Sequence, residues 1–199
     1  AVERCADLIQ RAIKLEQQNF LYIKALGSPW VQFNGHTLNL SHRQIEILCI
    51  LALYPHGICL EELHYALYGE RSVSLKTLKA ELSQLRSLLP HSIEARIYRL
   101  SCEVQCDFLR AEQSLNANLI SSTFSLYKGS FLSKSESPLL STWRHCFDAR
   151  LSQLIYQIKD IDQLLRIIGQ THDRIDAIQR LLELLPQDSA HRNYFSNLI

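Results

Sequence analysis

The sequence predicts an α+β domain, made of a small sheet, three helices and a short hairpin, followed by a region built only from helices. Three observations support this fold class. Residues 21–40 alternate between apolar and polar side chains, which is the period of a strand. Residues 41–89 change to a helical period, and residues 93–100 alternate again. From about residue 107 onward the apolar period is helical throughout.

Near the N-terminus, residues 2–18 predict an amphipathic helix, because their apolar side chains recur at an a/d-like spacing. These positions are Cys5, Leu8, Ala12 and Leu15. Two interpretations stay open: a helix that packs on the following domain, or a dimerising or signalling helix that descends from an upstream domain. Methionine is absent, even from position 1, and we therefore expect a fragment or a processed chain. We assign residues 1–19 as this linker or signalling helix.

Three short strands are predicted next, over residues 21–26, 30–33 and 37–40. Asn34 and Gly35 separate the second strand from the third, and both residues tolerate the positive φ angles of a two-residue hairpin turn. The three segments therefore predict a small antiparallel sheet.

Two helices are predicted after the sheet. Ser41 followed by Gln44 forms a capping box for a helix that runs to about Tyr54. This helix is apolar on nearly all sides, so we expect it to be the buried centre of the domain. A shorter helix begins near Leu60 with two glutamates in its first turn, where the helix dipole favours them, and it ends at Gly69.

The third helix carries leucines on one stripe and small or polar residues on the opposite face. Its leucines are at positions 75, 78, 82, 85 and 89, behind the capping residue Ser74. The opposite face carries Lys76, Thr77, Ala80, Ser83, Gln84 and Ser87. The segment from Ile93 to Leu100 follows and predicts a short hairpin. Two helices joined by five residues, with the second ending in a strand pair, describe a winged helix-turn-helix domain over residues 20–108.

The remaining residues, 109–199, predict an all-α region. The expected helices cover about 108–115, 118–129, 139–168, 171–185 and 189–198. Asp107 is the expected N-cap of the first, and Ser137 with Pro138 forms the start of the third, which is one long helix or two abutting ones that end at Gly169. Paired helices of this length resemble tetratricopeptide-like (TPR-like) hairpins, although no repeat of fixed period is present.

Composition excludes several classes of protein. No apolar run approaches the roughly 18 residues of a membrane span, and the N-terminus lacks the parts of a signal peptide, so we expect a cytoplasmic protein without membrane contact. The net charge of +1 argues against a protein that coats nucleic acid without sequence preference. Of the six cysteines only Cys102 and Cys106 are close together, and such a pair without an adjacent histidine is a poor zinc site. No metal or other cofactor is expected.

An enzyme is not expected either. His56, His64 and His91 have no nucleophile at a matching spacing, and the sequence contains no glycine-rich phosphate loop, HExxH motif or CxxC pair. Trp30 and Tyr98 are interpreted as core aromatics rather than platforms for stacking bases, because both fall at inward-facing positions of short strands.

Positive charge is concentrated in residues 71–99, which carry six basic and two acidic side chains, a balance of +4 against −3 for the rest of the chain. The candidates for contact with a DNA groove are Ser74, Lys76, Thr77, Lys79, Ser83 and Gln84. Lys76 and Gln84 are the best placed of these to reach base edges. The candidates for phosphate contact are Arg71, Ser72, Arg86, Arg96 and Arg99. Glu81 lies at the edge of this face and would repel phosphate unless it is paired.

Several phrases of the sequence resemble a known family. VQFNGHTLNLSHRQIEIL, LEELHYALYG, TLKAELSQLRSLL and IYRL are similar to stretches of OmpR/PhoB-type output domains, in particular the actinobacterial antibiotic-regulator (SARP-like) DNA-binding domains. LYKGSFL and WRHCFDARL resemble the helical bacterial transcriptional activator domain that follows such modules. The resemblance implies a homodimeric transcription regulator that binds double-stranded DNA, with a helical tail for dimerisation, effector response or contact with RNA polymerase. It also implies a GAF-like sensor domain upstream of the N-terminal helix.

The predicted wing departs from this family pattern. Family wings carry glycines in a longer hairpin, whereas Ile93–Leu100 has none and is two or three residues short. This leaves open whether the wing contacts the minor groove, so specificity should rest on the helix at residues 74–89. A second hypothesis also stays open: a protein-interaction module built on a degenerate winged helix that does not bind DNA. The short wing, the modest net charge and Glu81 favour it.

Overall fold

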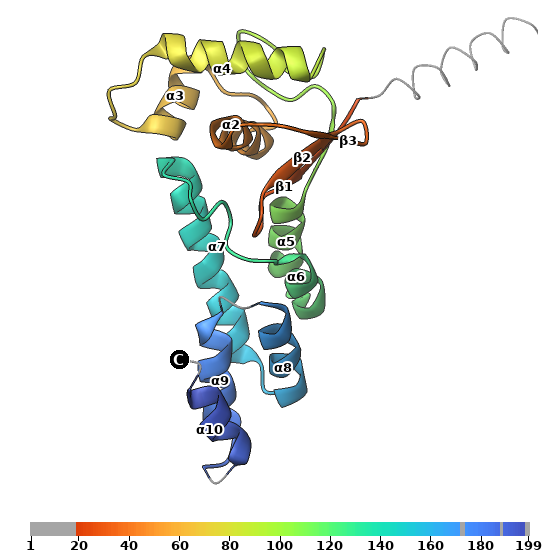
Figure 1. The fold of residues 1–199 in the computed structure, drawn as a ribbon, viewed down its shortest axis with the longest axis vertical. Helices are drawn as coiled ribbons and strands as arrows, with labels where there is room; N and C mark the ends of the chain where they lie inside the picture. Colours follow the sequence, from red (N-terminus) through yellow and green to blue (C-terminus); the bar gives the residue numbers. More distant parts are fainter. Residues whose placement is uncertain (1–18, 172–173, 188, 198–199) are drawn as a thin grey trace, which may run out of the picture.

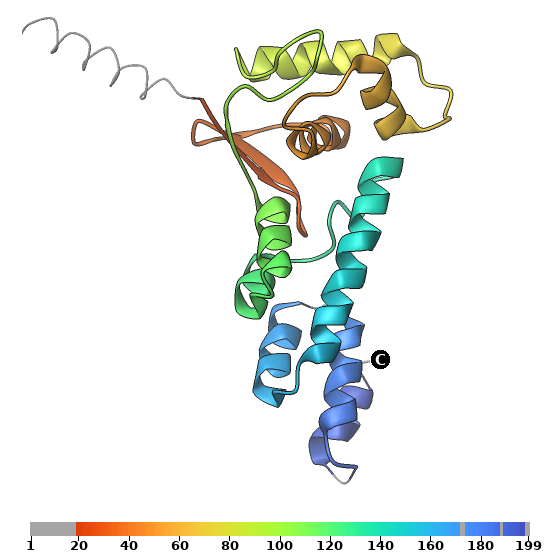
Figure 2. The same ribbon diagram turned by 180° about the vertical axis from the view of Figure 1, so that it is seen from behind.

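A computed structural model describes residues 19–171, 174–187 and 189–197 of the chain. In this part the molecule is elongated, with the sheet and α2 to α4 at one end and α8 to α10 at the other (Figures 1 and 2). Helix α7 connects the two ends. The helix predicted over residues 2–18, and with it the proposed link to an upstream sensor domain, lies outside the described residues.

The sheet contains four strands in the order β3-β2-β1-β4. They are β1 (Phe20–Lys24), β2 (Trp30–Phe33), β3 (His36–Leu38) and β4 (Glu103–Cys106). The hairpin between β2 and β3 is confirmed, because Asn34 and Gly35 have φ angles of 50° and 81°. Strand β4, which the sequence analysis did not predict, runs parallel to β1 and pairs Leu21 with Val104. Its pairing partner β1 lies about 80 residues earlier in the chain, so the local sequence around β4 does not indicate the pairing.

The interpretation of Trp30 as a core aromatic is wrong. Along β2 the buried residues are Val31 and Phe33, so Trp30 lies on the other face of the sheet. Its ring is half-buried and lies 5.3 Å from the ring of Tyr22. Tyr98 is half-buried and packs against the core.

Helices α2 (His42–Leu53), α3 (Leu60–Tyr68) and α4 (Leu75–Leu88) confirm the three predicted helices. The capping box of α2 is present, since Ser41 Oγ accepts from the backbone N–H of Gln44 at 3.2 Å and the Gln44 side chain accepts from that of Ser41. Eight residues of α2 are buried, as expected for a central helix. Of the leucine stripe on α4, Leu75 is 39% exposed while the other four leucines are buried. The spacing places Leu75 at the edge of the stripe, which explains this difference.

The predicted wing is a short hairpin whose ends are held by two backbone contacts. Ile93 pairs with Leu100, and the Glu94 backbone N–H donates to the Arg99 carbonyl at 3.0 Å. Tyr98 also pairs with Ile58, in the segment between α2 and α3, through bonds of 2.8 and 3.0 Å. The wing is therefore anchored on the helical part of the domain and not on the four-stranded sheet.

The tail is helical, as expected. It contains α5 (Asp107–Asn116), α6 (Ile120–Leu126), α7 (Pro138–Gln157), α8 (Ile161–Gln170), α9 (Ile175–Leu184) and α10 (Ala190–Ser196). Ser137 caps α7 and Pro138 is its first residue, and the stretch to Ile168 is two abutting helices. The helix end predicted near Ile168 and Gly169 is displaced by two residues, because α8 ends at Gln170 and Gly169 lies in its last turn.

The prediction that Asp107 caps α5 is also wrong. Cys106 occupies the N-cap position, and Asp107 is the first residue of the helix. Its carboxylate accepts from the backbone N–H groups of Ala25 at 2.8 Å, Leu26 at 3.0 Å and Phe108 at 2.7 Å. Burial raises the pKa of the Asp107 carboxyl, while these three donors oppose the shift. Asp107 therefore ties the start of the tail to the chain just beyond β1, which is a tertiary role that local sequence does not reveal.

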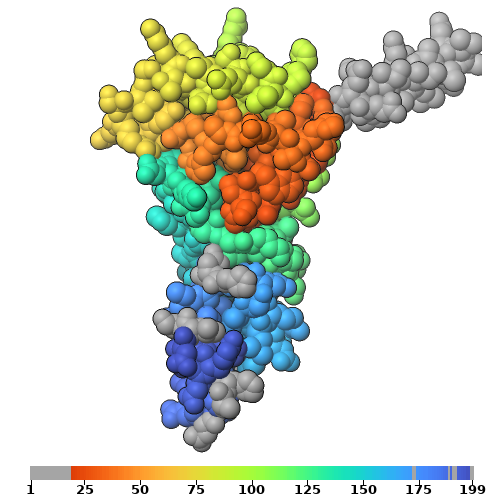
Figure 3. All heavy atoms as spheres, in the orientation of Figure 1, coloured from red at the N-terminus to blue at the C-terminus, as the bar shows by residue number. Residues whose placement is uncertain are grey.

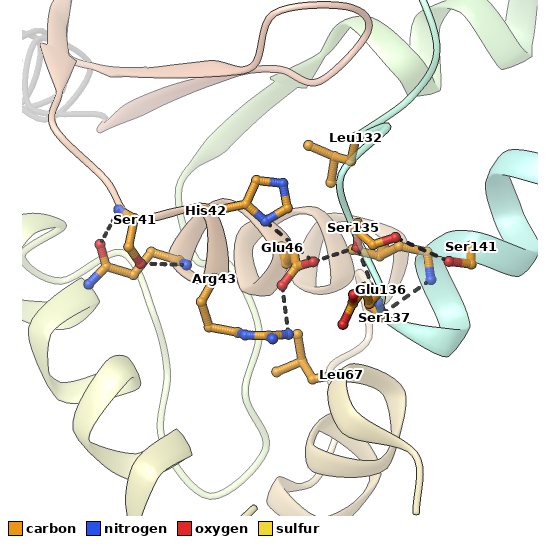
Figure 4. A network of polar contacts seen from close by, with 12 residues as sticks. Ser41, His42, Arg43, Glu46, Leu67, Leu132, Ser135, Glu136, Ser137 and Ser141 are labelled. Carbon is orange, nitrogen blue, oxygen red and sulfur yellow. Dashed lines mark hydrogen bonds and ion pairs between the residues drawn. The ribbon is translucent and has the colours of Figure 1, made fainter. Parts of the chain in front are cut away.

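Four aromatic rings inside the tail, with neighbouring centroids 4.5 to 5.3 Å apart, form a cluster between α5, the segment before α7, and α7: Phe108, Phe131, Trp143 and Phe147. A set of polar contacts joins the tail to the first domain and surrounds Glu46 of α2 (Figure 4). Glu46 is buried and pairs with Arg43 at 2.6 Å, while Ser135 donates to its other oxygen. Ser137, two residues after Ser135, donates to the Ala66 carbonyl of α3 at 2.7 Å.

Candidate nucleic-acid interface

Helix α4 lies at the outer end of the molecule, and the ribbon places no other described element beyond it (Figures 1 and 2). Its buried leucines pack against α2 and α3 and thereby set the rotation of the helix. The opposite face is exposed in the space-filling view of the upper end (Figure 3). The exposed residues of this face are Lys76, Thr77, Lys79, Ala80, Ser83, Gln84 and Ser87. We call them the α4 outer face.

The two lysines of the α4 outer face are available for a ligand. Neither Lys76 nor Lys79 forms an ion pair with an acidic side chain in the described part of the chain. The neighbours of these lysines on the same face are small: Ala80, Ser83 and Ser87. Short side chains permit close approach of the helix backbone to a partner surface, and the lysines supply positive charge.

Ser74 and Thr77 have local roles at the start of α4. Ser74 Oγ accepts from the Thr77 backbone N–H at 3.3 Å and lies 3.1 Å from the Thr77 hydroxyl. Both side chains remain exposed. The cap fixes where α4 begins, and both hydroxyls stay at the surface beside the lysines.

Arg86 lies on the flank of α4 that faces the wing. Its Nε donates to the Ile93 carbonyl at 3.3 Å, at the first residue of the hairpin. Arg96 lies in the turn of the hairpin, where it has a φ of 76° and is exposed. Arg99 is paired in a bidentate way with Glu94, at 2.8 and 2.9 Å, so the two charges of this pair cancel. The free positive charge of the wing therefore comes from Arg96.

Arg71 is placed away from the α4 outer face, at the junction with the tail. Its guanidinium pairs with Glu136 at 2.8 Å and donates to the backbone carbonyls of Tyr68 and Glu136. Ser72 is exposed in the loop that precedes α4. The structure thus brings Ser72 and the candidate residues of α4 to one end of the molecule. The N–H groups of Arg71, in contrast, form hydrogen bonds with other residues of the protein.

Glu81 lies on the flank of α4 that faces away from the wing. Gln84 lies beside it, at the edge of the α4 outer face that is nearer to α2. Glu81 is half-buried, and its Oε2 atom is buried without a hydrogen-bond partner in the described residues. Burial, together with the Glu81 carboxylate, raises the pKa of Tyr68 on α3, although Arg43 opposes the shift. Gln84 is exposed, and its Oε1 accepts from Gln44 Nε2 at 3.0 Å. The sequence analysis recognised Gln44 only as a capping residue, because nothing in the local pattern indicates a contact with a residue 40 positions away.

The described residues contain no group of three or more His, Cys, Asp or Glu side chains that could hold a metal ion. Burial raises the pKa of the Cys106 thiol to about 12 and raises that of Cys49 as well, which leaves both thiols protonated near neutral pH. A search for helices that are long and apolar enough to cross a bilayer found none among the described residues.

The chain is similar to known proteins in sequence and in fold. No family model matches the chain. A protein of Rhodococcus erythropolis, described as an uncharacterized 47.3 kDa protein in the thcA 5′ region, is 27% identical over 153 residues. The match covers 76% of this chain and 35% of that protein, so the chain spans about a third of the length of its curated relative.

A solved structure of Mycobacterium tuberculosis EmbR, in complex with a low affinity phosphopeptide, has a similar fold. The TM-score is 0.53 at 16% sequence identity, and the match covers 91% of this chain and 56% of that chain. The likeness extends over both the sheet-containing domain and the helical tail, and it supports the predicted α+β start followed by helices.

Proposed function

We propose that this chain is a sequence-specific, DNA-binding transcription regulator of the SARP-like type. The observation that carries the proposal is the α4 outer face: an exposed, outward-facing helix surface with two lysines that have no ion-pair partner among the described residues, set among small side chains. The second helix of a helix-turn-helix pair enters the major groove in such domains. The resemblance of the sequence to SARP-like domains and the fold likeness to EmbR support the same proposal.

In the proposed complex α4 lies in the major groove of double-stranded DNA. Lys76 and Gln84 contact base edges, while Ser74, Thr77, Lys79 and Ser83 line the groove. Phosphate contacts come from Ser72, Arg86 and Arg96, which flank the helix and set its register without reading sequence. Arg71 and Arg99 contribute less than the other arginines, because each already has an acidic partner.

The helical tail is proposed to serve dimerisation or contact with a partner such as RNA polymerase. Five large apolar side chains of the tail are 40% or more exposed: Leu119, Tyr156, Leu165, Ile175 and Tyr194. A protein contact over these side chains would remove their apolar surface from water. No catalytic step is proposed for the chain, and a homodimer is the expected state on DNA, since two-fold protein symmetry matches paired half-sites.

Selection of duplexes from a random pool at physiological salt tests this proposal. We expect enrichment of a direct or inverted repeat. Replacement of Lys76 and Lys79 by alanine should weaken specific binding and reduce the dependence of affinity on salt, because two positive charges are removed from the helix that lies in the groove. The matched control is Lys159→Ala, at an exposed position between α7 and α8. Unchanged binding by the Lys76/Lys79 double variant, or absence of any enriched duplex, would contradict the proposal.

A protein-interaction module is the second candidate, and a groove between α3 and the start of α7 favours it. The groove has a volume of about 860 Å³ and a mostly apolar lining that includes Ile58, Leu139 and the exposed ring of Tyr65. Glu61 and Glu62 lie at its border. Substitution of Tyr65 by serine would separate the two candidates, because it should leave duplex binding unchanged and abolish binding of a protein partner.

A further inference from the structure

We infer that Gln84 is a specificity-determining residue that presents only hydrogen-bond donors to DNA, because Gln44 holds its side-chain oxygen. The inference rests on the proposed function and adds to it a base preference: guanine or thymine, rather than adenine or cytosine, on the strand whose base edge Gln84 contacts. It follows from two hydrogen bonds that link Ser41, Gln44 and Gln84 in series. Together they fix the orientation of the side-chain amide of both glutamines.

The chain of hydrogen bonds begins at a group that can only donate. The backbone N–H of Ser41 donates to Gln44 Oε1 at 3.0 Å. This contact identifies which end of the Gln44 amide is the oxygen, so the other end, Nε2, carries the protons. Gln44 Nε2 lies 3.0 Å from the side chain of Gln84 and must donate to it. The atom of Gln84 that faces Gln44 is therefore Oε1.

The orientation of Gln84 has a direct chemical consequence. Its Oε1 is engaged with Gln44, which is itself buried, and no hydrogen bond joins its Nε2 to any described residue. Gln84 is exposed on the flank of α4. A glutamine held in this way offers two N–H donors outward, and its oxygen is turned toward the protein.

The pattern of donors and acceptors in the major groove determines which bases such a group can recognise. Adenine is normally read by a glutamine that donates to N7 and accepts from the N6 amino group, and this requires the amide oxygen to face the base, whereas the oxygen of Gln84 is directed toward Gln44. Guanine offers the acceptors N7 and O6, and thymine offers O4, so both suit a donor-only side chain. Cytosine presents an amino group that only donates, so it offers no acceptor to the N–H groups of Gln84.

The hydrogen bond to Gln44 also reduces the cost of recognition. A free glutamine on a helix surface samples several rotamers and two amide orientations, and binding must select one of them. Gln84 is restrained before DNA arrives, by a partner that the capping box of α2 holds in place. Preorganisation of this kind retains more of the interaction energy as affinity and specificity.

Duplex selection with three variants tests the inference. For the wild type we expect one position per half-site to be enriched for guanine or thymine on the strand that Gln84 contacts, and Gln84→Ala should lose the preference at that position alone, by about tenfold. Gln44→Glu keeps an acceptor for the Ser41 N–H but can only accept from Gln84, which would turn the Gln84 oxygen outward. In this variant the preference should change to adenine or cytosine. Gln84→Glu keeps the bond to Gln44, removes the outward donors, and should show the same change.

Two controls separate this effect from charge and from misfolding. Gln170→Glu, at an exposed position of α8, adds the same charge far from α4 and should leave every base preference unchanged. The circular dichroism spectrum and unfolding midpoint of each variant report on its fold, and Gln84→Ala tests the inference even where Gln44→Glu is unstable.

Three outcomes would overturn the inference. Gln84→Ala could weaken binding equally for all sequences, which would make Gln84 a phosphate contact. The base preference at the position that depends on residue 84 could be the same in a folded Gln44→Glu variant as in the wild type. Finally, Gln84→Ala could change nothing, which would remove Gln84 from the interface while the enriched duplex still supported the proposed function. Failure of the wild type to enrich any duplex would overturn the proposed function and this inference together.

Discussion

Ser135, in the segment between α6 and α7, donates a hydrogen bond to the carboxylate of Glu46, which is 1% exposed on α2. The same carboxylate pairs with Arg43 at 2.6 Å and lies 3.5 Å from His42. A buried charge needs such partners, because its desolvation is not otherwise compensated. The helical tail is thus docked on the central helix of the first domain through a group that neither part satisfies alone.

Replacement of Ser135 by alanine should therefore destabilise the protein. The variant leaves one oxygen of a buried carboxylate without its hydroxyl donor, and we expect a loss of about 1 to 3 kcal/mol in the free energy of unfolding. Urea denaturation measures this change. Ser133→Ala, at an exposed position two residues earlier, is the matched control and should have little effect. Equal midpoints for the two variants would show that the Ser135 contact contributes nothing to stability.

Asp107→Asn should also lower stability, through the contact between α5 and the end of β1. Asp107 Oδ2 accepts from the Leu26 backbone N–H at 3.0 Å, and Oδ1 accepts from two further N–H groups. An asparagine would place its NH₂ group against one of these donors, and we expect a cost of about 1 to 3 kcal/mol. Thermal unfolding checks the effect. Asp162→Asn, at an exposed residue in the first turn of α8, should cost less than about 1 kcal/mol.

Thiol labelling should distinguish the buried cysteines from the exposed one. Burial raises the pKa of Cys106 to about 12, so about one molecule in ten thousand carries the reactive thiolate at pH 8. Cys49 is fully buried, whereas Cys146 is exposed on α7. Mass spectrometry after brief exposure to iodoacetamide should find the label on Cys146 before Cys49 or Cys106. Rapid labelling of Cys106 in the folded protein would contradict the packing of β4 beside β1.

Glu94→Gln should strengthen DNA binding if the wing lies near phosphate. The substitution removes one negative charge and releases Arg99 from its bidentate pair. Exposed ion pairs are worth up to about 1 kcal/mol, which corresponds to a gain in affinity of about two- to fivefold. Titration of a selected duplex by fluorescence anisotropy measures the change, with Glu103→Gln on β4 as a charge-matched control. Equal affinities for the two variants would place the wing away from the duplex.

Local sequence signals predicted the structure correctly where the interacting residues are close together in the chain. The turn at Asn34 and Gly35, the capping box of Ser41 and Gln44, and the start of α7 at Ser137 each depend on residues within a few positions of one another. The helical period of Leu78, Leu82 and Leu85 correctly identified the buried face of α4. Consequently most of the elements, and the exposure of the candidate helix face, could be predicted.

The same signals failed where a distant partner decides the outcome. Strand β4 exists because β1 offers an unpaired edge about 80 residues earlier, and Asp107 is held by Ala25 and Leu26 rather than by the end of its own helix.

By itself the sequence determined the kinds of element, their order, and the small, polar and basic character of the α4 outer face, because these depend on period, capping and composition. The tertiary structure alone decided which of the predicted charges are free. It pairs Arg71 with Glu136 and Arg99 with Glu94, and it leaves Lys76 and Lys79 without ion pairs in the described residues. It also decided the orientation of the Gln84 amide, through a hydrogen bond to Gln44. The physical reason is that hydrogen bonds and ion pairs depend on proximity in space, which folding creates between residues far apart in the chain.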